Sequence, residues 1–378
     1  MRSWRRSPTA RGGLVLLLLL GACSHGEPFA PGTYGSSEPF QNTVPLRLTY
    51  GGGTDPAWLD TGTIIYSFES SDHRTSAGLP DECLGLLPAS GGRRTREICS
   101  RSRLDADTLD NFYLAAALAD STLAFVADHI PLGLGSSLGG GIMVAPFDSA
   151  PHGTVLRSFP FASSDGFMLF PGSLRWLGSD ALVFLADEQV SVEPCPTCDP
   201  DVYDRWKNVF RVGTAGAAPA EIIPGTRFAT SAAPGASGSE LYLTFGNDSL
   251  LVRRDLAAGA NTVVANFGPD AWPRDADYAA GRIVLVLGGK VGHHTLTEGT
   301  EETPVQADDQ GGLLAVVDAA TGTTAVLATP GLFFRRPRLS PDGRSIVAEG
   351  YAVTINPVPG GADTTVSLTG DIYRMELP

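Results

Sequence analysis

The chain has 378 residues, with 27 basic and 41 acidic side chains and a formal charge of −14 at pH 7. A surface this acidic repels phosphate backbones and anionic lipid headgroups, which argues against nucleic acid as a partner. The length allows one large all-β domain or two ordinary domains.

The first 22 residues contain four arginines, no acidic residue and the apolar run Leu14–Leu20. A basic start followed by a short apolar core is typical of a secretory signal. The run is shorter than the roughly 20 residues that a helix needs to span a bilayer, so we expect no permanent transmembrane anchor. Removal of residues 1–22 lowers the net charge from −14 to −18, because the four arginines are unopposed.

The apolar run ends in Leu20-Gly21-Ala22-Cys23, which resembles the lipobox of bacterial lipoproteins. The resemblance implies cleavage before Cys23 and acylation of its side chain. Several acyl chains give stable attachment, since each buried methylene contributes about 0.8 kcal/mol. The alternative is an ordinary secreted protein. Ser24, where an aspartate would favour the inner membrane, indicates an outer-membrane protein of the cell envelope that touches the membrane through its lipid anchor only.

Residues 23–43 are rich in Gly, Pro, Ser and Glu, which is typical of a flexible tether. From Val44 to Pro378, short runs of Val, Ile, Leu, Phe and Tyr alternate with Gly, Asp, Pro and Ser. This pattern predicts β-strands and no long amphipathic helix. We therefore expect a signal peptide over 1–22, a tether over 23–43 and one all-β domain over 44–378.

A repeated unit predicts the architecture of this domain. Its clearest copy, 336–348, contains Ser340-Pro341-Asp342-Gly343, a strong turn sequence between two short strands. Weaker copies recur at intervals of 60, 58, 57, 45 and 61 residues, taken between equivalent anchor residues. The anchors are Trp58, Leu118, Trp176, Ala233, Tyr278 and Leu339. Six units of four short strands predict a six-bladed β-propeller with four-stranded antiparallel blades.

The last unit ends at 372–377 and lacks a fourth strand, whereas a spare strand, 45–50, precedes the first unit. Pairing of the two would close the ring and remove an exposed sheet edge. We therefore predict that the N-terminal strand completes the C-terminal blade.

The turn motif resembles the repeats of TolB-type, WD-like six-bladed propellers, which read Pro-x-Trp-Ser-Pro-Asp-Gly-x-x-Ile-Ala-Phe. Only 337–347 matches the turn fully, so the resemblance concerns the fold more than a particular role. Residues 24–43 are too short for the additional N-terminal domain of TolB.

Four cysteines are disulfide candidates. Cys83 and Cys99 flank Gly91 symmetrically on two strand-like runs, which favours a cross-strand disulfide over free buried thiols. Cys195 and Cys198 form a Cys-x-x-Cys pair in a polar insertion. Its spacing suits a local disulfide or half of a zinc site, but no second pair completes a metal shell.

The repeat register places three charged residues close together. Asp275, Arg336 and Asp55 each lie three residues before their anchor in units 5, 6 and 1, which are neighbours in a closed ring. We expect them at the tunnel mouth, either as structural ion pairs or as a site for a peptide or other polar ligand.

No catalytic, cofactor-binding or complete metal-binding motif is found in the sequence. We therefore predict a monomeric, non-catalytic lipoprotein that binds or scaffolds an envelope protein, peptide or glycan. The alternative is a propeller enzyme of glycoside hydrolase or lyase type, because acids from different blades can converge without a local motif.

Overall fold

The computed structural model contains β-strands and no α-helix among the residues that it describes. Within the same residues, no helical segment has the length and apolar character needed to traverse a bilayer. The structure describes residues 41–42, 44–74, 80–99, 110–118, 122–129, 139–147, 154–160, 172–190, 204–214, 220–246, 248–289, 295–298, 303–306, 312–328, 332–357 and 364–377.

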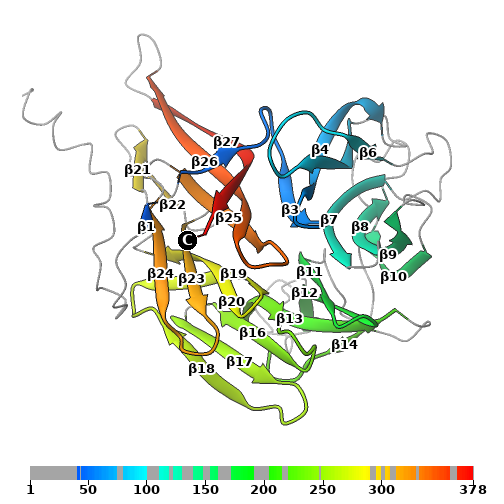
Figure 1. The fold of residues 1–378 in the computed structure, drawn as a ribbon, viewed down its shortest axis with the longest axis vertical. Coiled ribbons are helices and arrows are strands. Elements are labelled where there is room, and N and C mark those ends of the chain that lie inside the picture. The colour runs from blue at the N-terminus through cyan, green and yellow to red at the C-terminus, as the bar shows by residue number, and fades with distance from the viewer. Residues whose placement is uncertain are drawn as a thin grey trace, which may run out of the picture.

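The strands form six four-stranded antiparallel blades around a central axis (Figure 1), which confirms the predicted six-bladed propeller. Blades 1 to 3 comprise β3 (Thr54–Trp58), β4 (Thr63–Arg74), β5 (Pro80–Pro88) and β6 (Arg96–Ile98); β7 (Asp110–Leu118), β8 (Thr122–His129), β9 (Gly139–Pro146) and β10 (Thr154–Pro160); and β11 (Gly172–Leu177), β12 (Ala181–Val190), β13 (Asp204–Gly213) and β14 (Glu221–Ile222). Blades 4 to 6 comprise β15 (Ala229–Pro234), β16 (Glu240–Phe245), β17 (Leu250–Asp255) and β18 (Asn261–Asn266); β19 (Ala271–Ala279), β20 (Arg282–Gly289), β23 (Leu313–Asp318) and β24 (Thr324–Ala328); and β25 (Leu332–Leu339), β26 (Ser345–Pro357), β27 (Thr364–Glu376) and β2 (Leu46–Arg47).

Blade 5 carries two additions. A small hairpin, β21 (Thr295–Glu298) with β22 (Thr303–Gln306), is inserted between β20 and β23. The short strand β1 (Gln41–Asn42) pairs in parallel with the outer strand β24. The sequence had placed these two residues in the tether, and the difference arises because the outer edge of a blade offers unpaired backbone groups to any nearby extended segment.

The ring closes as predicted, because β2 near the N-terminus supplies the outer strand of blade 6. Leu46 pairs with Arg374 and Arg47 pairs with Tyr373. The buried carboxylate of Asp371 reinforces this closure, since it accepts a hydrogen bond from the Thr49 hydroxyl at 3.0 Å and forms an ion pair with Arg47. The closing strand is therefore held by side chains as well as by the backbone ladder.

The hydrophobic core is divided into six clusters, one at each boundary between neighbouring blades. Two anchor residues add a directional contact across these boundaries. The indole Nε1 of Trp58 in blade 1 donates to the Arg338 carbonyl of blade 6 at 3.0 Å, and Trp176 in blade 3 donates to the Ala116 carbonyl of blade 2 at 3.0 Å. Each indole is thus packed against the preceding blade and has its only donor satisfied.

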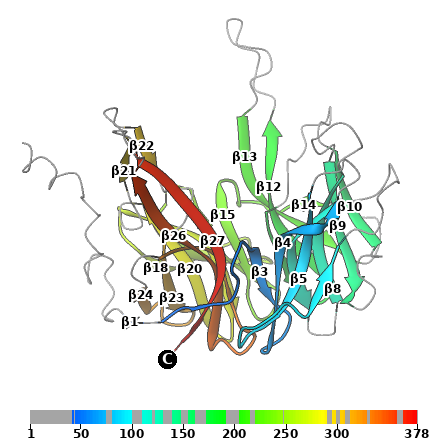
Figure 2. The same ribbon diagram turned by 90° about the horizontal axis from the view of Figure 1, so that it is seen from above.

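The two faces of the ring differ. The long β12–β13 and β26–β27 hairpins project on one side, which we call the hairpin face, whereas the C-terminus lies on the other side (Figure 2). The antiparallel order places the start of each innermost strand on the hairpin face. The turns that follow the innermost strands, such as Ser340–Arg344, therefore lie on the opposite face.

The innermost strand of every blade contains a register shift shortly before its anchor residue. At this bulge Asp55, Ser173, Asp275 and Arg336 adopt left-handed backbone conformations, with φ between 48° and 54°. Such conformations are unfavourable for residues other than glycine and persist where surrounding contacts hold them. The same strained position is therefore repeated around the tunnel.

Candidate functional site in the central tunnel

The bulges carry the charged residues that the sequence placed at the tunnel mouth, and the structure brings all three together. The Arg336 guanidinium Nη1 lies 2.6 Å from Asp55 Oδ1 and 2.9 Å from Glu349 Oε1. The Arg336 backbone N–H donates to Asp275 Oδ2 at 3.1 Å. We call Asp55, Asp275, Arg336 and Glu349 the mouth cluster.

Glu349, on β26, was not predicted, and the structure explains its presence. In blade 5 the bulge residue Asp275 accepts the bulge N–H of the next blade. Blade 6 has Arg336 at that position, which cannot accept a hydrogen bond. Glu349 takes over this role and accepts the Asp55 N–H at 2.7 Å. The sequence signal that could have revealed it is its place as the one charged residue in the run 345–355, which follows the Ser340–Arg344 turn.

The electrostatics of the mouth cluster follow from its burial. Burial raises the pKa of Asp55 from 3.8 to about 7, against the lowering effect of Arg336 and with a further rise from the Glu349 carboxylate. Burial also lowers the pKa of Arg336, but the carboxylates of Asp55, Glu349 and Asp275 outweigh it and raise that pKa overall. The arginine therefore stays charged, whereas Asp55 changes its charge near neutral pH.

Accessibility separates the members of the cluster. The side chain of Arg336 is 34% exposed, whereas those of Asp55 and Glu349 are 6% and 0% exposed. Glu349 is also bound through its second oxygen, which accepts from the Tyr351 hydroxyl at 2.8 Å. Asp55 and Glu349 are thus engaged within the fold, whereas Arg336 is the partly exposed cation of the cluster and Asp275 is half-buried.

A second charged group lies deeper in the tunnel. Arg175 of blade 3 donates from Nε to Asp277 Oδ1 of blade 5 at 3.0 Å, so this buried ion pair crosses the tunnel past blade 4. Asp277 Oδ2 accepts the Leu339 N–H of blade 6 at 2.8 Å. Burial raises the pKa of Asp277 and lowers that of Arg175, and each partner opposes the shift of the other. The pair joins three blades.

These residues line a cavity of about 220 Å³, which we call the inner cavity. All six blades contribute to it, and its walls include Trp58, Trp176, Tyr278, Arg175 and Arg338. This cavity was not predicted from the sequence, because no local pattern indicates that side chains of blades 3 and 5 meet across the tunnel.

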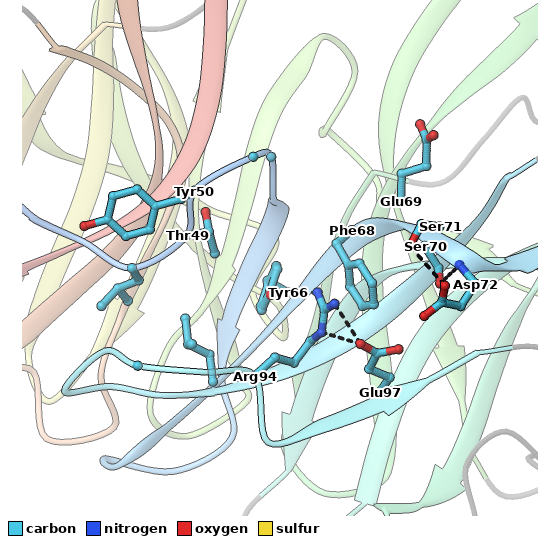
Figure 3. A pocket seen from close by; sticks show the side chains of 15 residues that line it. Thr49, Tyr50, Tyr66, Phe68, Glu69, Ser70, Ser71, Asp72, Arg94 and Glu97 are labelled. Atoms are coloured by element: carbon cyan, nitrogen blue, oxygen red, sulfur yellow. Dashed lines mark hydrogen bonds and ion pairs between the residues drawn. The ribbon is translucent and has the colours of Figure 1, made fainter.

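A larger cavity, of about 370 Å³, lies between the closing strand of blade 6 and blade 1, and we call it the seam pocket (Figure 3). Arg94 stacks on the Phe68 ring at 3.5 Å, donates to the Tyr66 hydroxyl at 3.2 Å and pairs with Glu97 at 2.7 Å. Figure 3 shows Glu69 pointing away from this group. Because the guanidinium is already engaged on three sides, the described residues of the pocket present no free cation to a ligand.

The cysteines are placed as follows. Cys83 and Cys99 form a disulfide between β5 and the end of β6, with their Cα atoms 4.6 Å apart. Cys99 also lies near His73 and Glu97, but its sulfur is engaged in the disulfide, so the group lacks the ligands of a structural zinc site. Cys23, Cys195 and Cys198 lie outside the described residues.

Fold and tunnel together define the class of the protein as a closed six-bladed β-propeller with a charged central tunnel. No family model matches the chain, and no curated protein matches it. Similar solved structures include TolB from Acinetobacter baumannii, at 15% identity and a TM-score of 0.49, with 85% of this chain and 65% of the TolB chain covered. This chain thus spans just under two thirds of that protein.

Two further similar structures have different roles. A gluconolactonase from Xanthomonas campestris matches at 14% identity and a TM-score of 0.48, covering 91% of this chain and 99% of that one. A chain of a nidogen–laminin complex matches at 12% identity and a TM-score of 0.43, covering 74% and 81%. At these identities the likeness concerns the fold alone, and no activity is carried over from it.

Proposed function

We propose that this protein is a non-catalytic, lipid-anchored binding protein of the bacterial cell envelope, which holds an envelope protein, peptide or glycan at its hairpin face and tunnel mouth. The observation that carries the proposal is the difference in exposure between the residues of the mouth cluster. Asp55 and Glu349 are buried and engaged, whereas the Arg336 guanidinium is partly exposed on the side where the long hairpins rise. Such a frame presents a fixed charge to a partner.

The enzymatic alternative is less well supported by this geometry. Glycoside hydrolysis needs two carboxyl groups that reach the scissile bond. At the mouth, Glu349 accepts hydrogen bonds from Asp55 N–H and Tyr351 and pairs with Arg336. A carboxylate with these partners stabilises the ring and is poorly placed to exchange protons with a substrate.

Photo-crosslinking in living cells tests the binding site. A benzophenone amino acid at Tyr50, which is 79% exposed and precedes β3, reports on partners near the hairpin face. The same probe at Thr321, in the β23–β24 turn on the opposite face, is the control. We expect an adduct from position 50 only, and its yield should fall several-fold with Arg336→Glu but not with Arg253→Glu on β17. Equal yields with Arg336→Glu would reject the proposed site.

Membrane attachment is tested separately through Cys23. The lipobox-like sequence and the tether support a lipid anchor at this residue. Cys23→Ser should therefore release the protein into the soluble periplasmic fraction and abolish incorporation of labelled palmitate. Retention of Cys23→Ser in the outer-membrane fraction would contradict the anchor, whatever the outcome of the crosslinking.

A further inference from the structure

Two arginines line the inner cavity, and the described residues supply a carboxylate partner to one of them. Arg175 and Arg338 are each 7% exposed and both line the cavity. Asp277 is the acidic residue in the cavity wall, and its two oxygens are taken by Arg175 and by the Leu339 N–H. The cavity wall thus holds two buried guanidinium groups and one carboxylate, which pairs with Arg175.

Among the described residues, Arg338 is the guanidinium of the cavity that has no carboxylate partner. Its Nη1 donates to the carbonyl of the preceding residue, Pro337, at 3.1 Å. Within the described part of the chain, no carboxylate lies within ion-pair distance of it. Arg175 also has a buried Nη2 atom with no hydrogen-bond partner there. Burying an uncompensated charge is costly, and proteins normally pair such a group or bind an ion to it.

The walls of the cavity limit which anions could bind beside Arg338 and Arg175. Trp58 and Trp176 donate their only N–H groups to backbone carbonyls, so they present apolar ring surface to the cavity. Blades 1 and 2 contribute small alanines, among them Ala57 and Ala116, at the level where the other blades carry Arg175 and Arg338. A space of about 220 Å³ with apolar walls and two fork-shaped donors suits a compact organic anion.

We propose that the inner cavity is a second ligand site, which binds the carboxylate of a small organic monoacid, or of a peptide chain end, between Arg338 and Arg175. The planar guanidinium groups match a carboxylate in two-point hydrogen bonding. The body of the ligand packs against the indole rings. This site lies towards the face opposite the hairpins and is independent of the proposed function, since Arg336 takes no part in it.

Thermal melting of the purified full-length protein tests the site, with benzoate as the probe. We expect benzoate to raise the melting temperature in a saturable manner, because it binds only the folded state. The neutral benzamide, and sodium chloride at matched ionic strength, should leave it unchanged. Titration should shift the indole N–H resonances of Trp58 and Trp176 in nitrogen-edited NMR spectra. Stabilisation by chloride alone would overturn the assignment of a carboxylate ligand.

Arg338→Met is the decisive variant, because its guanidinium holds no other side chain of the described fold. It should fold at least as stably as the natural protein without ligand, and bind benzoate roughly tenfold more weakly or worse, the loss expected for one charge-assisted pair. Arg253→Met, on the exposed face of β17, is the matched control. Equal benzoate binding by Arg338→Met and the natural protein would overturn the proposal.

A short peptide with a free C-terminus, tested beside its amide, separates the two sources of a carboxylate. Binding of the free peptide alone supports a chain end, and binding of benzoate alone supports a free acid. Absence of binding by both probes would overturn the proposal. Arg336→Gln should leave the benzoate-induced shift in melting temperature unchanged, so a failure here is distinguishable from a failure of the hairpin-face site.

Discussion

The backbone N–H of Arg336 in blade 6 donates to the carboxylate of Asp275 in blade 5, at 3.1 Å. Arg336 has a φ of 48° at its bulge, a conformation that costs about 1 kcal/mol or more for a residue with a side chain. The carboxylate offsets this cost, since a hydrogen bond to a charged acceptor contributes about 1.5–3 kcal/mol. Contacts of this kind fix the angle between neighbouring blades.

Glu349 has the same role at the boundary of blades 6 and 1, which leads to a prediction on stability. Glu349→Ala should lower the free energy of unfolding by about 3–5 kcal/mol, because Arg336 loses a buried partner. Glu349→Gln keeps an acceptor for the Asp55 N–H and should cost about 1–2 kcal/mol. Urea unfolding measures both. Glu69→Ala, on the exposed side of β4, should stay within about 0.5 kcal/mol. A cost for Glu349→Ala as small as that of the control would contradict this role.

Asp55 predicts a pH dependence of definite sign. Its pKa of about 7 in the folded state exceeds its ordinary value of 3.8, so the folded state binds the proton more tightly. Its contribution to stability is therefore complete below about pH 4 and is lost as the pH rises through 7. The unfolding free energy of the natural protein minus that of Asp55→Asn should fall across this window and level off above it. A difference that rises with pH would mean that the Arg336 ion pair dominates.

The fold was predictable from the sequence to a large extent because its signals are local or repeated. The blade number was predicted from the turn sequence at Ser340–Arg344 and from the spacing of anchors such as Trp58 and Trp176. The closure was predicted from the spare strand before the first unit. One anchor was displaced. Trp58 donates to the carbonyl of the residue before the anchor Leu339 of the preceding blade. Trp176 donates to the Ala116 carbonyl of blade 2. By the same rule, the anchor of blade 2 is residue 117 rather than 118.

The candidate site was predictable only in part. Counting three residues back from each anchor identified Asp55, Asp275 and Arg336, since the repeat register brings equivalent positions to one level of the tunnel. Arg175 and Asp277 also occupy equivalent positions, one residue before their anchors Trp176 and Tyr278, but the register alone does not show that they pair. Their ion pair spans the tunnel between blades that are not neighbours, and its geometry depends on the size of the side chains of the other blades.

Because Asp371 holds the closing strand, we expect it to contribute more to the stability of the ring than Glu376, which also lies on β27. Asp371→Ala should cost about 3–5 kcal/mol, because it leaves Arg47 and Thr49 without their buried partner. Glu376→Ala removes an ion pair with Arg374 whose acidic side is 65% exposed, and should cost at most about 1 kcal/mol.

Urea unfolding measures both losses, and hydrogen exchange should show faster opening of β2 and β27 in Asp371→Ala alone. Similar losses for the two variants would indicate that the backbone ladder closes the ring without help from this carboxylate.

The most direct test of the proposed binding site compares Asp55→Asn with Arg336→Gln in the crosslinking assay from position 50. Both substitutions break the same ion pair, but only Arg336→Gln removes the partly exposed guanidinium. The proposal predicts that Asp55→Asn retains most of the adduct and that Arg336→Gln loses most of it. Equal yields from the two variants would mean that the mouth cluster serves the stability of the ring and that no ligand is held by its arginine.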